Sequence, residues 1–500
     1  MQISVRAQAG PTTRVDLVAV TVTQITKKTL PPVLAALDQR CGGAIAAQVK
    51  ADGFTGRAKQ TALIYPAAKG APSRVLLVGL GEPTEVDADG LRDAAGTTAK
   101  RAQGSGAKKI ALVVPKLRRI KPGAAAQALS EGLILGSYRF DRYRKSDVDT
   151  QETLRSVALL FDAGGIGEAR EGVRAGQALA EAQNLARDLS NEPANILTPV
   201  KLASVARATA RKAGLRCRVL DVKQMQKLGM GAILAVGQGS ANPPRMIVME
   251  YIPPRRTSKT PTICIVGKGI TFDTGGISIK PAGNMHEMKH DMSGAATVVG
   301  TMQAIAQLKV PQHVVGIIGA AENMPGGKAY RPGDVIRAMS GKTIEIMNTD
   351  AEGRVVLADA LHYARKEYNP EAMVDLATLT GACVVALGSS ATAIFSREDT
   401  LAAELIEAGQ TAGECLWRMP LFDEHEKAMK SRVADLKNSG SREAGASTAA
   451  GFLAAFAGAG PWAHLDIAGT GWGNKSEGAH VPGATGVGVR TLVAWLQARG

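Results

Sequence analysis

The chain has 500 residues, of which 45% are hydrophobic and 21% are charged, and its formal net charge is +15. This composition excludes a wholly disordered chain and a collagen-like chain, and it provides enough apolar material for a large core. The five cysteines are far apart and odd in number, which excludes a disulfide framework and indicates a reducing compartment, so we expect a cytoplasmic protein.

The first part of the chain alternates short β-branched runs with alanine-rich stretches, which predicts an α/β domain. The predicted strands are 16–23, 62–65, 74–80, 109–114 and 154–161. The predicted helices are 31–49, 88–103 and 124–135. The N-terminus contains no apolar signal core, so we do not expect secretion.

A dense basic block lies within residues 101–145. Its basic members are Arg101, Lys108, Lys109, Lys116, Arg118, Arg119, Lys121, Arg139, Arg142, Arg144 and Lys145, against only Glu131 and Asp141. A block of this density can bind the phosphate backbone of a nucleic acid. The favoured explanation is a solvated face, or a surface that meets acidic partner subunits.

A helix rich in alanine and glutamate, 167–189, and a loop, 191–195, follow the first domain. A larger α/β pattern begins near residue 197. Its predicted strands are 216–220, 246–251, 262–266, 313–319, 343–347, 372–377 and 464–467. We therefore expect an N-terminal α/β domain at 1–166, a linker at 167–196 and a larger α/β domain at 197–500. Residues 444–463 have the length of a membrane span but are rich in glycine and alanine, which favours a buried helix and a turn, so we expect no membrane contact.

Three of the predicted strands end in polar clusters, at 267–276, 348–354 and 378–381. In open α/β sheets the ligand crevice lies beyond the carboxyl ends of the strands, so we expect the three clusters to meet in one site. Asp350, Glu352 and Arg354 are spaced two apart. On extended backbone they would point the same way, before a helix over 355–364.

The four carboxylates Asp273, Asp291, Asp350 and Glu352 would repel one another in one crevice, which would raise their pKa values. Two divalent cations would neutralise them, and oxygen-rich sites suit Mg²⁺, Mn²⁺ and Zn²⁺. A paired-metal site is a recurrent device for hydrolysis. The alternative is that these carboxylates are scattered helix caps and surface ion pairs.

The segment 348–361, NTDAEGRVVLADAL, resembles the signature of the leucyl aminopeptidase (cytosol aminopeptidase) family, with Val355 and Val356 as soft variants. Other similar segments are VGKGITFDTGGISIK at 266–280, MKHDM at 288–292, NEPAN at 191–195, TLTG at 378–381 and WAHLDIAG at 462–469. The clear resemblance covers about 180–495, and the N-terminal part is similar only in layout. The resemblance implies an α/β/α catalytic domain with a mixed central sheet.

The resemblance also implies two divalent metal ions per subunit, Mn²⁺ or Zn²⁺. One would be held by Asp273, Asp350 and Glu352, and the other by Lys268, Asp273, Asp291 and Glu352. Lys268 can ligate only as a neutral amine, which an adjacent dication makes possible because metal binding and deprotonation are coupled. Two metals also lower the pKa of a shared water.

Lys280 and Arg354 would be the catalytic pair. Lys280 would stabilise the developing oxyanion. Arg354 stays charged, so it cannot be the base; in this family it holds a bicarbonate that shuttles the proton. A simple ion pair between Arg354 and a site carboxylate is the alternative.

Peptides with a free N-terminus are the implied substrates, because one metal would bind the α-amine. The implied substrate-binding residues predict a preference for Leu-like and Met-like N-terminal residues. They are Met288, Asn348, Thr378, Leu379, Thr380, Gly381 and the 446–448 region.

Two alternatives remain. His286, Glu287 and His290 match the HExxH pattern of zinc proteases, in which two histidines on one helix face bind the metal. In the family, the positions equivalent to the two histidines are not ligands. Some bacterial members of the family also bind DNA, and the basic block within residues 101–145 could do so here.

The resemblance also implies a homohexamer of two stacked trimers.

Overall fold

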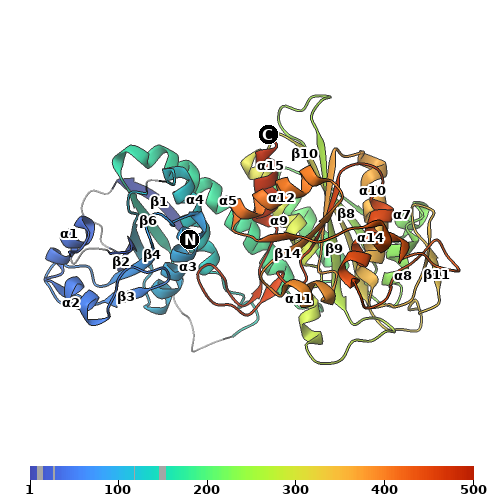
Figure 1. Cartoon of the computed structure of the whole chain (residues 1–500), viewed down its shortest axis with the longest axis horizontal. Helices are drawn as coiled ribbons and strands as arrows, with labels where there is room; N and C mark the ends of the chain where they lie inside the picture. The colour runs from blue at the N-terminus through green and yellow to red at the C-terminus, as the bar shows by residue number, and fades with distance from the viewer. Residues whose placement is uncertain (8–14, 26–28, 118, 146–153) are drawn as a thin grey trace. The chain divides into compact units, whose positions relative to one another are not determined.

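The computed structural model describes residues 1–7, 15–25, 29–117, 119–145 and 154–500. It divides into two units, each built around one large sheet (Figure 1). The smaller unit comprises Met1–Glu181 and Asn474–Pro482, and the larger comprises Ala182–Gly473 and Gly483–Gly500. The two-domain α/β organisation is as predicted, whereas the division at 166 and 196 stays a prediction.

The smaller unit contains a six-stranded sheet in the order β1-β6-β5-β2-β4-β3. All neighbours are parallel except β3, which is antiparallel to β4. The strands are β1 (Gln2–Ala7), β2 (Leu17–Thr23), β3 (Thr61–Ile64), β4 (Val75–Gly81), β5 (Lys109–Val113) and β6 (Ser156–Phe161). Strand β1 was not predicted, because this edge strand buries only Ile3 and Val5 and so has little hydrophobic pattern.

Helices cover both faces of this sheet. Successive residues of β2 point to opposite sides, so its two faces pack against different helices. Leu17 and Ala19 pack under α3 (Ala88–Gly104) and α4 (Pro122–Gly136). Val18 and Val20 pack under α1 (Pro32–Arg40) and α2 (Ala44–Ala51). The prediction of one helix over 31–49 was wrong. Gly42 and Gly43 have positive φ values of 63° and 83°, which end α1 and separate it from α2.

The larger unit contains an eight-stranded mixed sheet in the order β15-β14-β17-β13-β9-β10-β8-β7. The four central strands, β17, β13, β9 and β10, are parallel to one another, whereas β8 and β14 are antiparallel to their central neighbours. The strands are β7 (Arg216–Leu220), β8 (Arg245–Tyr251), β9 (Thr262–Asp273), β10 (His313–Asn323), β13 (Ala372–Ala377), β14 (Thr392–Ser396), β15 (Leu416–Arg418) and β17 (Trp462–Asp466). A separate three-stranded sheet contains β11 (Val335–Arg337), β12 (Thr343–Glu345) and β16 (Leu436–Lys437), and β18 (Trp472–Gly473) pairs with β19 (Gly483–Ala484).

Helices also cover both faces of the larger sheet (Figure 1). One layer contains α9 (Ser293–Leu308), α12 (Asp399–Ala412) and α15 (Val489–Ala498), and the other contains α8 (Gly231–Gly237), α10 (Glu352–Tyr368) and α14 (Gly445–Ala457). The remaining helices are α5 (Ile166–Asn191), α6 (Pro199–Ala213), α7 (Val222–Lys227), α11 (Gly381–Leu387), α13 (Asp423–Lys427), and the 3₁₀ helices η1 (Ala163–Gly165) and η2 (Met285–His290).

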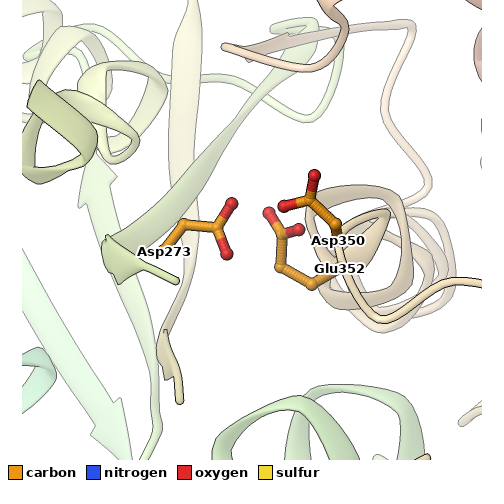
Figure 2. A group of neighbouring side chains, drawn as sticks. All are labelled: Asp273, Asp350 and Glu352. Atoms are coloured by element: carbon orange, nitrogen blue, oxygen red, sulfur yellow. The ribbon is translucent and has the colours of Figure 1, made fainter. Parts of the chain in front are cut away.

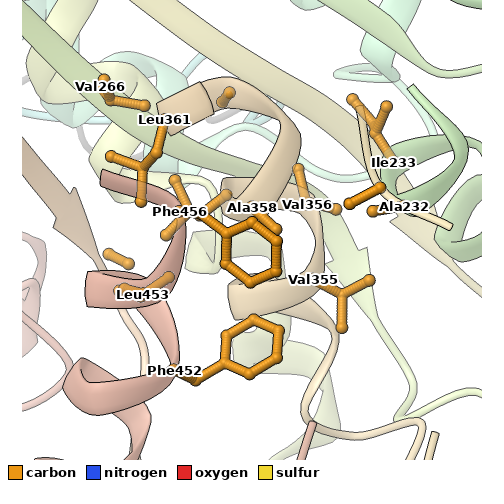
Figure 3. Close-up of a cluster of buried hydrophobic side chains, with 14 of the residues drawn as sticks. Ala232, Ile233, Val266, Val355, Val356, Ala358, Leu361, Phe452, Leu453 and Phe456 are labelled. Carbon is orange, nitrogen blue, oxygen red and sulfur yellow. The ribbon is translucent and has the colours of Figure 1, made fainter. Parts of the chain in front are cut away.

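The core beneath α10 holds this helix against β9 (Figure 3). Val355 and Leu361 of α10 belong to one buried cluster with Phe452 and Phe456 of α14 and Val266 of β9. Full burial of such side chains stabilises the fold by about 1.5–3 kcal/mol each. The start of α10 and the end of β9 are therefore supported by a rigid, well-packed layer. The predicted buried helix within 444–463 is α14.

In the described part of the chain, no helix is both long and apolar enough to cross a membrane.

Candidate functional site

Strand β9 positions two of the predicted site residues, Lys268 and Asp273. The predicted end of this strand at residue 266 was wrong, because β9 continues to Asp273. It does so because β10 runs parallel beside it, with Lys268 opposite Gly319 and Asp273 opposite Asn323. Both site residues thus come from a buried central strand rather than from a loop.

The start of α10 positions Glu352 and Arg354, which corrects the prediction that Asp350, Glu352 and Arg354 share one extended face. Glu352 is the first residue of α10, and Asp350 lies two residues before the helix. The preceding strand β12 belongs to the three-stranded sheet, so only two of the three predicted strand ends, those of β9 and β13, lie in the central sheet. A carboxylate in the first turn is favoured by the positive end of the helix dipole.

Asp273, Asp350 and Glu352 nevertheless converge, as Figure 2 shows. One carboxylate oxygen of each lies within 4.8 Å of the others. Asp273 and Glu352 are buried, with 2% and 1% of their surface exposed, and Asp350 is half-buried. Three carboxylates from two separate segments therefore face one small volume.

Lys268 joins Asp291 to this cluster. Its Nζ lies 2.8 Å from Oδ2 of Asp291 and 2.9 Å from Oε1 of Glu352, and it donates to the carbonyl of Thr378 at 3.0 Å. Asp291 follows η2 and is 5% exposed. The amine of Lys268 is thus surrounded by oxygen atoms from three segments of the chain.

Lys280 bridges the other two carboxylates. Its Nζ lies 2.8 Å from Oδ2 of Asp273 and 2.5 Å from Oδ1 of Asp350. The loop before it turns back sharply at Gly275 and Gly276, whose φ values are 83° and 64°. A Cβ atom on Gly275 would lie 2.4 Å from the carbonyl oxygen of Ser278, so the turn requires glycine there.

Burial and mutual repulsion perturb these groups. Burial raises the pKa of Glu352 to about 8, and the charge of Asp273 adds to the effect. Burial and Asp273 also raise the pKa values of Asp291 and Asp350, although Lys268 and Lys280 oppose the shift. Burial lowers the pKa of Lys268, but the neighbouring carboxylates outweigh it and the net shift is upward. The four carboxylates exceed the two ammonium groups in charge, so the donor set fits divalent cations.

Arg354 has a different environment. Its Nη1 donates to the carbonyl of Asn438 at 3.1 Å, and its Nε has no hydrogen-bond partner among the described residues. Burial lowers the pKa of Arg354 to about 10, so the guanidinium is still charged at neutral pH. No carboxylate of the described residues lies within ion-pair distance of it, so the structure does not support the alternative of a simple ion pair.

The predicted substrate-binding residues lie on four segments. The segment 378–381 joins β13 to α11, and Thr378 Oγ1 donates to Oδ1 of Asp291 at 2.6 Å. Asn348 Oδ1 accepts from the backbone N–H of Asp350 at 2.8 Å. Met288 is half-buried on η2. The 446–448 region is buried in the first turn of α14, beside α11, where a Cβ on Gly445 would lie 3.2 Å from Cβ of Ala382.

Sequence reasoning missed several residues that hold the site. Asn323 Nδ2 donates to Oδ1 of Asp273 at 2.8 Å and to the carbonyl of Thr349 at 3.0 Å. Tyr330 donates to the same carbonyl at 2.9 Å. Asn438 donates to the carbonyl of Asn348 at 2.7 Å. These are single polar residues far from the motifs in sequence, and no local pattern marks them.

The HExxH alternative is not supported. The segment is the 3₁₀ helix η2, which has three residues per turn, so residues four apart do not share a face. His286 is exposed, whereas His290 is buried and its Nδ1 lies 2.5 Å from the carbonyl oxygen of Glu287. The acidic cluster described above contains neither histidine.

Comparison with known proteins agrees with this geometry. The family model described as "Cytosol aminopeptidase family, catalytic domain" matches residues 184–493, and the N-terminal domain of the same family matches residues 18–147. A probable cytosol aminopeptidase of Roseiflexus castenholzii is 51% identical over 452 residues, which cover 89% of this chain and 92% of the relative. A probable cytosol aminopeptidase of Syntrophotalea carbinolica is 44% identical and covers 99% of this chain and 100% of the relative.

Two solved structures share the whole fold. A variant of tomato leucine aminopeptidase has a TM-score of 0.88 at 35% identity, covering 100% of this chain and 96% of that chain. The bottromycin maturation enzyme BotP in complex with Mn has a TM-score of 0.86 at 37% identity, covering 97% and 99%. The fold and the acidic site therefore define a metal-dependent peptidase, a hydrolase. The chain belongs to the cytosol aminopeptidase family, as the resemblance of its motifs predicted.

Proposed function

We propose that this protein removes N-terminal residues from peptides, with leucine and other apolar residues preferred, and that it uses two divalent cations per subunit. The convergence of Asp273, Asp350 and Glu352 beside Lys268 is the observation that carries the proposal. Mn²⁺ is the ion we propose first, because BotP, which is similar over the whole chain, has been solved with Mn; Zn²⁺ is the alternative.

Asp273, Asp350 and Glu352 would hold one cation, and Lys268, Asp273, Asp291 and Glu352 the other. Bound cations of this kind polarise a carbonyl group and lower the pKa of water. Lys268 would first lose a proton, because its ammonium now pairs with Asp291 and Glu352. Glu352, whose pKa is raised to about 8, would also be required in its ionised form.

Lys280 is suited to stabilise negative charge on the peptide carbonyl oxygen. Burial alone would lower the pKa of Lys280, but Asp273 and the other carboxylates raise it by more than burial lowers it. The net pKa is above its usual value, so the ammonium is charged at neutral pH. The side chain is 21% exposed, so a substrate can reach it. A charged donor fixed beside the reacting group stabilises an oxyanion without further reorganisation.

Arg354 is suited to hold an anion, and we propose bicarbonate. Its charge is buried without a carboxylate partner in the described structure, and its Nε is unused. A guanidinium presents donors in a planar fork that matches a planar oxyanion. The bound anion, rather than the arginine, would then accept and pass on the proton.

The substrate side chain would lie among Met288, Asn348, Thr378–Gly381 and residues 446–448. Thr378 is adjacent to Lys268 and Asp291, so the 378–381 segment borders the carboxylate cluster directly. The free α-amine of a peptide would bind one of the two cations as a neutral ligand, which would account for cleavage at the N-terminus. The half-buried thioether of Met288 suits an unbranched or Leu-like side chain.

The test is metal analysis of the purified protein alongside turnover of leucine p-nitroanilide. We expect about two divalent ions per chain, loss of turnover after chelation, and recovery on addition of Mn²⁺ or Zn²⁺. Turnover that survives complete removal of metal would overturn the proposal. A panel of other aminoacyl p-nitroanilides measures the preference for leucine.

We also propose a cytoplasmic homohexamer, a dimer of trimers, as the working form. Family membership supports this assembly. Sedimentation equilibrium distinguishes a hexamer from smaller species.

DNA binding by the basic block of residues 101–145 stays a prediction. Lys109 lies at the start of β5, whereas Lys116, Arg119 and Lys121 follow its end, so the described block is divided between the two ends of a strand. This distribution does not favour one continuous strip, and Arg118 lies outside the described residues. Gel shifts over a salt series test the prediction, because binding through phosphate contacts weakens steeply with salt.

A further inference from the structure

Asp466 is a buried carboxylate at the end of β17, outside the proposed set of metal ligands. It is 1% exposed and lies opposite Ala377 of β13 in the parallel register. Its Oδ1 accepts from the backbone N–H groups of Leu379 and Ala468, both at 3.1 Å. Its Oδ2 accepts from Thr380 Oγ1 at 2.7 Å. Asp466 therefore ties the end of one strand to the turn that follows its neighbour.

That turn touches the proposed metal ligands on its other side. The carbonyl of Thr378 accepts from Nζ of Lys268 at 3.0 Å, and its hydroxyl donates to Asp291 at 2.6 Å. Thr378 directly precedes Leu379, whose backbone N–H donates to Asp466, and it contacts both the amine of Lys268 and the carboxylate of Asp291. A movement of the turn would displace Lys268 and Asp291 together.

A second buried pair, His464 and Asp375, lies next to Asp466. His464, two residues earlier on β17, is fully buried, and its Nδ1 lies 2.6 Å from Oδ1 of Asp375 on β13. Trp462 Nε1 donates to the other oxygen of Asp375 at 2.8 Å. Phe395 of β14 stacks on the imidazole, with 5.9 Å between ring centres. His464 Nε2 has no hydrogen-bond partner in the described structure, which is costly for a buried polar atom.

The neighbouring carboxylates favour the protonated form of His464. Two buried carboxylates, Asp375 and Asp466, lie on adjacent strands and need positive charge nearby. Burial lowers the pKa of His464, but Asp375 and then Asp466 outweigh burial, with Arg354 of α10 opposing, and the net shift is upward. Burial also raises the pKa of Asp466, and the charge of His464 and the hydrogen bonds from Thr380, Ala468 and Leu379 oppose that shift.

We propose that Asp466 is a positioning residue of the metal site: its carboxylate holds residues 378–380 so that Thr378 orients Lys268 and Asp291. This inference rests on the proposed function. Partners of metal ligands typically affect metal affinity or activity by about 10- to 100-fold when they are removed. A purely structural role, in which Asp466 only joins β13 to β17, would change stability without changing metal affinity.

The experiment compares Asp466→Asn with the full-length wild-type protein by titration of the metal-free form with Mn²⁺. We expect the wild-type circular dichroism spectrum, an Mn²⁺ dissociation constant raised by about 10- to 100-fold, and leucine p-nitroanilide turnover that recovers in part at saturating Mn²⁺. Unchanged Mn²⁺ affinity would overturn the inference.

The matched control is Glu414→Gln. Glu414 is also a buried carboxylate with three donors, Gly488 N–H, Thr491 N–H and the Thr491 hydroxyl, but these lie at the start of α15. We expect Glu414→Gln to lower the melting temperature and to leave Mn²⁺ affinity unchanged. Equal weakening of Mn²⁺ binding in both variants would show a general effect of destabilisation and overturn the inference.

A second pair of variants covers the case in which Asp466→Asn does not fold. Thr380→Val removes the hydroxyl that donates to Asp466, and Thr380→Ser retains it. We expect weaker Mn²⁺ binding in the first and near-wild-type binding in the second; equal Mn²⁺ affinity in the two variants overturns the inference. If the wild-type protein itself neither binds Mn²⁺ nor cleaves leucine p-nitroanilide, the proposed function fails. If the wild type does both and the variants match it, only the role of Asp466 fails.

Discussion

The side chain of Lys268 occupies the space that a Cβ atom on Gly353 would need. Such an atom would lie 2.5 Å from Cε of Lys268 and 2.7 Å from both its Cδ and its Nζ. Gly353 is the second residue of α10, directly after Glu352. The absence of a side chain there allows β9 and α10 to approach until Lys268 reaches Glu352.

Gly353→Ala is therefore expected to displace Lys268 from Glu352 and Asp291. We expect turnover of leucine p-nitroanilide to fall by about 100-fold, the order of loss that a displacement of about 1 Å causes in an active site. The control is Gly167→Ala, also near the start of a helix, where a Cβ would meet nothing within 4 Å. Wild-type turnover in Gly353→Ala would contradict the prediction.

Asp350→Ala and Glu352→Ala are each expected to abolish cleavage of leucyl peptides while the fold is retained. Each substitution removes one of three converging carboxylates. It also removes a repulsive negative charge, so stability should not fall greatly. Leucine p-nitroanilide turnover and circular dichroism measure the two effects. If a variant is active and has wild-type metal content, the carboxylate that it lacks is not a metal ligand.

Lys280→Met is expected to lower kcat by about 100- to 1,000-fold, as the loss of an oxyanion donor does in other hydrolases. Lys328→Met, at an exposed lysine outside the acidic cluster, serves as the control and should keep wild-type kcat. Steady-state kinetics at saturating Mn²⁺ separates kcat from effects on metal binding. A change in KM alone would assign Lys280 to substrate binding instead.

His286→Ala is expected to leave activity largely unchanged, whereas Asp273→Ala should be inactive. His286 is exposed on a 3₁₀ helix, and Asp273 is buried in the acidic cluster. Parallel assays of leucine p-nitroanilide turnover check both variants. The opposite pattern, with His286→Ala inactive and Asp273→Ala active, would restore the zinc-protease alternative.

The stability of the metal-free protein is expected to fall as pH rises from about 4.5 to about 8. Burial raises the pKa of Glu352 from 4.5 to about 8, so over this range the folded state binds more protons than the unfolded state. Melting temperatures measured in chelator at several pH values test this. Glu352→Gln should flatten the dependence.

Asp359 provides the control for this pH effect. Burial raises its pKa to about 7, and it accepts hydrogen bonds from the backbone of Met339 and Ile233, away from the acidic cluster. Asp359 therefore also makes the folded state less stable as pH rises. Asp359→Asn should remove this part of the pH dependence whether or not Mn²⁺ is present. Mn²⁺ should flatten the wild-type dependence, because it binds the ionised form of Glu352. Equal slopes in wild type and Glu352→Gln would refute the assignment.

The convergence of Asp273, Asp350 and Glu352 was predictable from the sequence because these residues lie in long local motifs, whereas their role as metal ligands stays a prediction. Their geometry was predicted less well. The two-residue spacing of Asp350, Glu352 and Arg354 suggested extended backbone, but the helix begins at Glu352 and convergence comes from the approach of α10 to β9. The convergence of these carboxylates depends on packing between segments that are distant in sequence, here at Gly353 and Lys268. A rule based on local residue spacing has no information about that packing.

Supporting residues were missed for the same reason. Asn323 lies at the end of β10 and Asn438 directly follows β16, yet both hold the segment that precedes α10. A single asparagine has no signature until the fold brings it to its partner. The short strands β1, β15 and β16 were missed because few residues in each are buried, so their hydrophobic alternation is weak.

The nine-residue segment Asn474–Pro482 belongs to the smaller unit although it comes near the end of the chain. Gly478 fits against Gly96 of α3, where a Cβ on Gly96 would lie 2.4 Å from its carbonyl oxygen. A gene fragment that stops at residue 181 would therefore omit part of this unit and expose the surface of α3 around Gly96. Dissection of the protein into separately expressed halves requires a linker-bridged or circularly permuted design, because a single cut cannot yield an intact small unit.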